Sequence, residues 1–173
     1  MSFSNPAQFD ATLTLATAED TAALARAIAP LLVPGDVILL HGPIGAGKTH
    51  FSRALIQTRL AALGQIEDVP SPTFTLVQVY EAGRVEIWHA DLYRLNRQDE
   101  VIELGLDEAF TTAICLIEWP DRLGSLRPAG ALDLTLDPDA QGLARRVRLH
   151  SDSGHWAKVF AAVRGFGFDH GCA

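Results

Sequence analysis

A glycine-rich segment that ends in a lysine and a threonine is the part of this sequence best suited to chemistry. Residues 42–49 read GPIGAGKT and match the phosphate-binding pattern G-x-x-x-x-G-K-[ST]. Lys48 is one of only two lysines in the chain, the other being Lys158. The match predicts a site for phosphate groups at this segment, to which Lys48 contributes positive charge.

A site for phosphate groups needs many hydrogen-bond donors in a small space, because these groups carry several negative charges. Glycine adopts positive φ angles freely, and successive backbone N–H groups can then turn inward around an anion at the start of a helix. Lys48 would contact the β- and γ-phosphates, and the Thr49 hydroxyl would bind Mg²⁺. The residues expected to contact a nucleotide here are Gly42, Gly45, Ala46, Gly47, Lys48, Thr49 and His50. A glycine-rich turn that binds nothing is the alternative.

The segments around this motif have the pattern that a phosphate site requires. Residues 36–41, whose centre at 37–40 is apolar, are typical of a buried strand, and residues 49–63 are typical of a helix that stops at Gly64. Upstream, alternation over residues 11–15 predicts a strand, and the acidic start of residues 17–32 predicts a helix. The motif is therefore expected between a strand and a helix.

Downstream, two alternating runs predict an antiparallel hairpin, with residues 74–80 and 84–89 joined by residues 81–83. The other expected elements are a helix at 98–104, a buried strand at 113–117, strands at 132–136 and 145–149, and a helix at 155–163. The sequence predicts an α/β fold of the P-loop NTPase type, with a mixed central sheet, helices on both faces and antiparallel hairpins. We expect one domain over residues 1–164 and a flexible tail over residues 165–173.

The composition limits the classes of protein that fit. A chain of 173 residues with 48% hydrophobic content can bury the core of one domain. Its formal net charge of −7 argues against a wide nucleic-acid surface. Cys115 and Cys172 are too few for a disulfide framework, and the apolar run around Cys115 predicts a buried free thiol. We see no targeting signal and no membrane-spanning stretch, so a cytoplasmic protein is expected.

Two hydroxyl residues, one on each side of Pro72, lie just before the predicted hairpin. Residues 69–74 read VPSPTF, and Pro70 and Pro72 would hold this loop extended. Ser71 or Thr73 would then offer oxygen to the γ-phosphate and its metal, as switch loops do. An ordinary proline-stiffened connection is the alternative.

An acidic residue follows at the end of the hairpin's second strand. Alternation places His89 and Asp91 on the same side of that strand, where both would face the phosphate site. Asp91 would hold the waters of a metal or position the attacking water. The alternative for Asp91 is a helix cap or an ion pair with Arg94.

A second acid, Glu118, follows the apolar strand at residues 113–117 directly. P-loop NTPases place the acid that supports Mg²⁺ at the carboxyl end of a buried strand beside the phosphate loop. Glu118 is therefore the preferred acid on the metal side. The neighbouring Trp119 would stack on a base, contact a partner or belong to the core.

Four segments together resemble the TsaE (YjeE) family of small bacterial ATPases. They are residues 42–49, 71–76 (SPTFTL), 91–95 (DLYRL) and 117–120 (IEWP), and the likeness covers about residues 17–121. The resemblance implies a protein that binds ATP and Mg²⁺ and docks onto a TsaD–TsaB complex. It would hydrolyse ATP to support that complex in the threonylcarbamoyl modification of the tRNA adenosine next to the anticodon, and tRNA would be contacted only through the complex.

The resemblance also implies a role for each matching residue. The acids Asp91 and Glu118 would be essential to catalysis, with Thr73 in the switch-like loop. Trp119 would be the aromatic side chain beside the nucleotide. Thr49 and Glu118 would hold the metal. Pro43 departs from the family, in which this position is often acidic, but the glycines of the loop are retained.

Three other functions share the phosphate loop. A GTPase is suggested by Asn96-Arg97-Gln98-Asp99, which approximates the guanine-reading pattern N-K-x-D, but this segment follows the hairpin instead of a late buried strand. A small-molecule kinase would need an acceptor pocket and an arginine-rich lid, and no segment has that composition. A scaffold that binds ATP without turnover is the third alternative.

Overall fold

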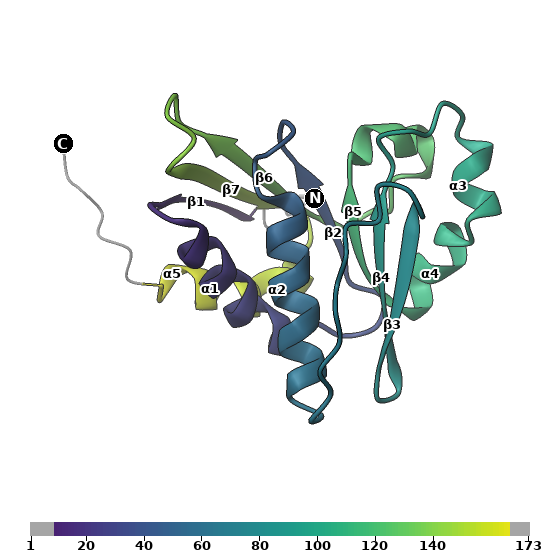
Figure 1. Ribbon diagram of the computed structural model, residues 1–173, viewed down its shortest axis with the longest axis horizontal. Coiled ribbons are helices and arrows are strands. Elements are labelled where there is room, and N and C mark those ends of the chain that lie inside the picture. Colours follow the sequence, from purple (N-terminus) through teal and green to yellow (C-terminus); the bar gives the residue numbers. More distant parts are fainter. Residues whose placement is uncertain (1–8, 167–173) are drawn as a thin grey trace, which may run out of the picture.

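The computed structural model describes residues 9–166, and its centre is a seven-stranded sheet in the order β1-β7-β6-β2-β5-β4-β3 (Figure 1). The strands are β1 (Phe9–Leu15), β2 (Val37–His41), β3 (Val77–Ala82), β4 (Val85–Asp91), β5 (Ile114–Glu118), β6 (Leu132–Pro138) and β7 (Arg145–Ser151). The α-helices are α1 (Ala18–Ile28), α2 (Lys48–Ala61), α3 (Asp99–Glu103), α4 (Leu106–Thr112) and α5 (Ala157–Arg164). Short 3-10 helices are η1 (Ala29–Leu31), η2 (Pro120–Leu126) and η3 (Gly154–Trp156).

The sheet is mixed, as expected. Strand β2 lies between β5 and β6 and runs parallel to both, and β4 runs parallel to β5. The hairpins β3–β4 and β6–β7 and the pair β1–β7 are antiparallel. Every residue of β5 is buried, as in a strand that is covered on both faces. The carboxyl ends of β2, β4 and β5 therefore meet at one edge of the sheet.

Helices cover both faces of this sheet (Figure 1). On one face, α1, α2 and α5 pack over side chains such as Leu40, Leu116 and Leu134. On the other face, α3 and α4 pack over the alternate side chains, including Leu39 and Ile117. Because β-strand side chains alternate between faces, one apolar run supplies both cores. The predicted α/β fold of the P-loop NTPase type is confirmed.

Helix α1 begins as predicted and ends sooner. Thr17 caps it, since the Thr17 hydroxyl accepts from the N–H of Asp20 while the Asp20 carboxylate accepts from the N–H of Thr17. The helix was expected to reach residue 32, but it ends at Ile28 and continues as η1, in which Pro30 lies. Proline lacks the N–H that the α-helical bonding pattern would use there.

Two further boundaries differ from the sequence-based expectation. Strand β3 begins at Val77 and not at residue 74, because residues 72–75 form a turn and Leu76 has a positive φ of 66°. Its extension to Ala82 leaves only Gly83 and Arg84 in the hairpin turn, where Gly83 has φ 68°. Helix α4 was not predicted; Gly105, with φ 80°, both ends α3 and begins α4.

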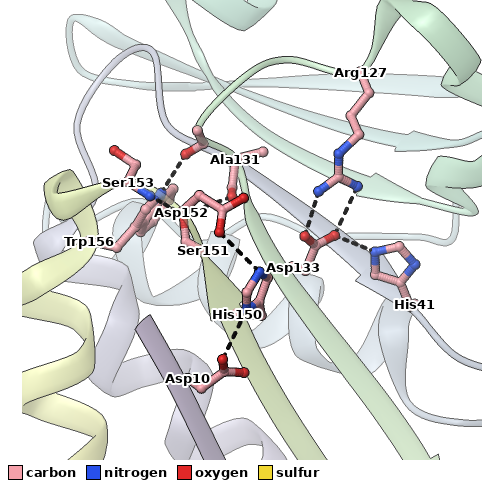
Figure 2. Close-up of polar contacts among 11 residues, drawn as sticks. Asp10, His41, Arg127, Ala131, Asp133, His150, Ser151, Asp152, Ser153 and Trp156 are labelled. Carbon is pink, nitrogen blue, oxygen red and sulfur yellow. Dashed lines mark hydrogen bonds and ion pairs between the residues drawn. The ribbon is translucent and has the colours of Figure 1, made fainter. Parts of the chain in front are cut away.

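Over β6, β7 and β1, the face that α3 and α4 cover elsewhere bears polar side chains (Figure 2). Asp133, His150 and Asp10 occupy one row across these three strands. Asp133 accepts hydrogen bonds from Arg127 and lies 2.6 Å from His41 Nε2. His150 Nδ1 lies 3.2 Å from an oxygen of Asp10. This half of the face is exposed or half buried and is held together by ion pairs.

Three remaining expectations concern single segments. Cys115 is a buried free thiol, and burial raises its pKa to about 12. The expected tail over residues 165–173 lies outside the described residues from residue 167 onward. Within residues 9–166, no helix has the length and apolar character that crossing a membrane requires.

Candidate functional site

The phosphate-binding motif forms the loop between β2 and α2. Gly42, Gly45 and Gly47 all have positive φ angles, of 142°, 81° and 107°. A Cβ atom on Gly42 would lie 2.4 Å from the carbonyl oxygen of Leu136, a distance at which the backbone would have to move. The loop therefore has the backbone conformation expected from its glycines, and at position 42 only glycine fits.

Lys48 is the first residue of α2, and its side chain turns back over the loop. The Nζ atom donates to the carbonyl oxygens of Gly42 at 2.5 Å and of Pro43 at 2.9 Å. It also lies 4.1 Å from the centre of the Trp119 ring, a cation–π contact. Burial lowers the pKa of Lys48, and the negative charges of Glu118 and Asp91 oppose that effect. The Lys48 ammonium group is thus held at the loop by two carbonyl oxygens, and phosphate oxygens could take their place as hydrogen-bond acceptors.

Glu118 lies at the end of β5, one strand away from the loop, and is only 2% exposed. The Thr49 hydroxyl is 2.9 Å from one of its carboxylate oxygens and 3.1 Å from the other. The Nε2 atom of the fully buried His89 is 2.8 Å from Oε1 of the same carboxylate. The Thr49 hydroxyl and the buried Glu118 carboxylate therefore lie next to each other, and both provide the oxygen ligands that hard cations prefer.

Asp91 lies at the end of β4 and is paired with Glu118 in the parallel register of β4 and β5. Its Oδ2 atom accepts from the Thr73 hydroxyl at 3.3 Å, and its Oδ1 atom accepts from the Tyr93 backbone N–H at 3.0 Å. Thr73 in turn lies 2.7 Å from the Ser71 hydroxyl. Asp91 thus contacts Thr73 in the loop at residues 69–74, whereas Glu118 contacts Thr49 at the end of the phosphate-binding motif.

These groups line a pocket of about 450 Å³. Its lining residues are Ile44, Gly45, Ala46, Gly47, Lys48, Thr49, His50, Thr73, Asp91, Tyr93, Glu118, Trp119 and Arg145. Most of the residues expected at the site come together here from four separate stretches of the chain. Gly42 lies beneath the loop and shapes it without lining the pocket.

Two of the expected side chains differ from their sequence-based description. His89 was expected to face the phosphate site, but it lies behind Glu118 and does not line the pocket. His50 lies at the pocket, yet its Nε2 atom is 2.9 Å from the carbonyl oxygen of Ala18 in α1. Trp119 is half buried beside the pocket, with its ring centre 4.8 Å from that of Tyr93.

Sequence reasoning missed Tyr93 and Arg145. Tyr93 lies within residues 91–95, which were named for Asp91, and its position two residues after Asp91 could have indicated that it lies at the site. Arg145 belongs to the β6–β7 hairpin, where nothing in the local sequence indicates a ligand, and only the sheet topology brings it to the loop. Residues 96–99, which approximate the guanine-reading pattern, lead into the first residue of α3 and do not line the pocket.

A second pocket of about 450 Å³ lies at the opposite end of the strands. It contains one ion pair, in which His155 Nε2 lies 2.5 Å from Oδ1 of Asp36. Asp36 also accepts from the N–H of Val33, so the carboxylate is already engaged on both oxygens. This pocket has no glycine-rich loop at a helix start, and the pocket at Lys48 is therefore the candidate functional site.

The candidate site is suited to a polyphosphate with a bound metal ion. Inward-turning amides at the start of α2 and the Lys48 ammonium group can neutralise phosphate oxygens. Thr49 and Glu118 present oxygen ligands at one side of that cradle, and Asp91 presents another carboxylate near Thr73. The arrangement is suited to binding a chain of phosphate groups.

Comparison with known proteins agrees with these observations. A model of the family described as threonylcarbamoyl adenosine biosynthesis protein TsaE matches residues 15–147. The tRNA threonylcarbamoyladenosine biosynthesis protein TsaE of Rickettsia conorii is 40% identical over 124 residues, which are 72% of this chain and 69% of the relative. The Bacillus subtilis protein of the same name is 38% identical over 119 residues, 68% of this chain and 72% of the relative.

A solved structure is similar along nearly the whole chain. The crystal structure of Bacillus subtilis YdiB aligns with a TM-score of 0.73 at 25% sequence identity, and the alignment covers 92% of this chain and 97% of YdiB. The family match spans both acids and the phosphate loop described above. On this evidence the chain belongs to the TsaE family of threonylcarbamoyladenosine biosynthesis proteins.

Proposed function

We propose that this protein is an ATPase that binds ATP with Mg²⁺ and hydrolyses it to support a TsaD–TsaB complex in the threonylcarbamoyl modification of tRNA. The observation that carries the proposal is the contact of Thr49 with both oxygens of Glu118, in the same pocket as Lys48. A glycine-rich turn without a ligand has no need of a buried carboxylate at that position. Family membership supplies the pathway.

Mg²⁺ fits the residues that are present. Within residues 9–166 no group of three or more His, Cys, Asp and Glu side chains could hold a metal by itself. Mg²⁺ binds through few protein oxygens and completes its octahedron with water and substrate phosphate, which suits Thr49 and Glu118. When bound, the ion would neutralise charge on the β- and γ-phosphates.

The positions of the two acids suggest different tasks. Glu118 is buried, touches Thr49 and receives a hydrogen bond from His89, which fixes its carboxylate on the metal side. Asp91 lies toward Thr73, where a switch-like loop would contact the γ-phosphate. We assign Glu118 to the metal and Asp91 to the orientation of the attacking water.

The division of tasks predicts different losses for two isosteric variants. Glu118→Gln should remove most of the gain in ATP affinity that Mg²⁺ provides, whereas Asp91→Asn should keep that gain and lower turnover at least ~100-fold. Calorimetric titration of ATP with and without Mg²⁺ separates the two, and Asp107→Asn, at an exposed position on α4, is the control. Equal effects of Mg²⁺ on the wild type and Glu118→Gln would contradict the assignment.

The test of the proposed function is a hydrolysis assay with ATP and with GTP, alone and with TsaD, TsaB and tRNA. Slow hydrolysis by the isolated protein and a partner-stimulated rate that prefers ATP are expected, since the charge of the transition state is often completed by a partner. Transfer of phosphate to a metabolite would instead support the small-molecule kinase. Tight ATP binding with no turnover in the full mixture would support the nucleotide-dependent scaffold.

A further inference from the structure

We infer that Arg145 is a further catalytic residue of this site, whose guanidinium group binds the terminal phosphate of ATP and stabilises the charge that develops there during hydrolysis. The inference rests on the proposed function. Arg145 comes from the β6–β7 hairpin, outside the four sequence motifs at residues 42–49, 71–76, 91–95 and 117–120, and it lines the same pocket as Lys48.

The guanidinium group of Arg145 is held in place by two backbone carbonyl groups. Its Nε atom donates to Ala46 of the phosphate loop at 2.9 Å, and its Nη1 atom donates to Leu143 at 2.9 Å. A Cβ atom on Gly47 would lie 3.4 Å from Nε, so the group lies against the last glycine of the loop. Among the described residues the Nη2 atom has no hydrogen-bond acceptor.

The charges of the pocket indicate that Lys48 alone would not balance a bound triphosphate. Lys48 and Arg145 are the lysine and arginine among its lining residues, and Asp91 and Glu118 are the carboxylates. These four charges cancel, and a triphosphate adds several negative charges of its own. Lys48 sits over Trp119 at one wall, so its ammonium group reaches one part of the phosphate chain. Arg145, the first residue of β7, reaches the pocket from the β6–β7 hairpin.

A purely structural role, in which Arg145 only braces the phosphate loop, does not account for all of its features. The bond from Nε to Ala46 already braces the loop, and a brace does not require the free Nη2 or a place in the pocket wall. Arginine presents several donors in a planar fork, and this suits simultaneous contact with a carbonyl group and a phosphate. Arg145 thus has the position and the spare donors to bind phosphate.

The step assisted by Arg145 is ordinary hydrolysis. The oxygen of a water molecule bonds to the γ-phosphorus atom, and the bond to the β–γ bridging oxygen breaks. ADP leaves with that electron pair, and the protons of the water end on inorganic phosphate and in solvent. Arg145 remains protonated throughout and donates hydrogen bonds to phosphate oxygens, an effect worth roughly 10³- to 10⁵-fold in rate for arginines so placed.

The experiment compares Arg145→Ala with Arg146→Ala, its exposed neighbour on the opposite side of β7, in the full mixture of TsaD, TsaB and tRNA. We expect Arg145→Ala to lower kcat at least ~100-fold and to leave ADP affinity within about threefold, with Arg146→Ala unchanged. Binding of ADP with aluminium fluoride, which mimics the transferring phosphoryl group, should weaken in Arg145→Ala alone. Arg145→Lys should recover part of the rate.

Two results would overturn the assignment. A wild-type rate in Arg145→Ala would show that the side chain takes no part in hydrolysis, and equal losses of ADP and ADP–aluminium fluoride binding would show that it only braces the loop. Thermal unfolding of each variant shows whether the fold is intact. If the wild type binds and hydrolyses ATP and Arg145→Ala gives either of these results, only the inference about Arg145 fails. If the wild type neither binds nor hydrolyses ATP, the proposed function fails as well.

Discussion

Glu118 shows how much of this site depends on single buried groups. Its carboxylate is nearly inaccessible to solvent, yet it contacts Thr49 on one side and His89 on the other. A buried carboxylate without partners would be costly, so these two contacts keep it in place. The Glu118 side chain is therefore preorganised in the pocket.

Among single residues, the glycines of the phosphate loop make a sharp stability prediction. Gly42→Ala should destabilise the fold by more than about 2 kcal/mol, because its Cβ atom would meet the Leu136 carbonyl oxygen at 2.4 Å in addition to the strain of a positive φ. Gly45→Ala should cost about 1 kcal/mol, because φ is also positive but no atom lies within 4 Å of its Cβ. Urea unfolding of both variants measures the difference.

The comparison separates steric contact from backbone preference. If the two alanine variants unfold at the same urea concentration, close packing of the loop against β6 does not determine the requirement for glycine at position 42. Far-ultraviolet circular dichroism of each variant before unfolding confirms that the same fold is compared.

At the scale of elements, the parallel strands β2, β4 and β5 determine which side chains meet. Asp91 and Glu118 occupy matched positions in β4 and β5, and Leu40 of β2 is matched to Glu118 two residues before the loop begins. Three chain segments far apart in sequence thus end side by side at one edge of the sheet, the usual place for ligands in open α/β sheets.

The ion-pair cluster on β6 makes a prediction about pH (Figure 2). Burial alone would raise the pKa of Asp133, but hydrogen bonds from His41 and Arg127 outweigh it and lower the pKa to about 2. Since the folded-state pKa lies below the ordinary value of 3.8, the charged group stabilises the fold above about pH 4, and this contribution is lost as pH falls through about 2. Asp133→Asn should therefore cost about 1 kcal/mol at pH 7, a figure reduced by the exposure of Arg127.

Chemical unfolding at pH 7 and at successively lower pH measures this contribution. The gap between wild type and Asp133→Asn should narrow below about pH 4. Asp137→Asn, an exposed residue on the same strand and the same face, is the control and should show little effect at any pH. A gap of constant size down to the acid transition would show that the Asp133 charge is not responsible.

For the whole molecule, the parts that were predictable from sequence are those with a local pattern. The phosphate loop, the buried strand before Glu118 and the capped start of α1 each follow from neighbouring residues. Helix α4 was missed because it is short and begins at the same Gly105 that ends α3. Arg145 was missed because its meeting with Ala46 depends on the antiparallel pairing of β6 and β7, which a local pattern does not specify.

We propose that the loop at residues 42–47 and Lys48 capture the phosphates of ATP, and calorimetric titration of ATP and Mg²⁺ is the decisive measurement. We expect binding by the wild type and by Lys158→Ala, which removes the other lysine from an exposed position on α5, and a loss of affinity of at least ~100-fold in Lys48→Ala. Equal ATP affinity in the wild type and a correctly folded Lys48→Ala variant would contradict it.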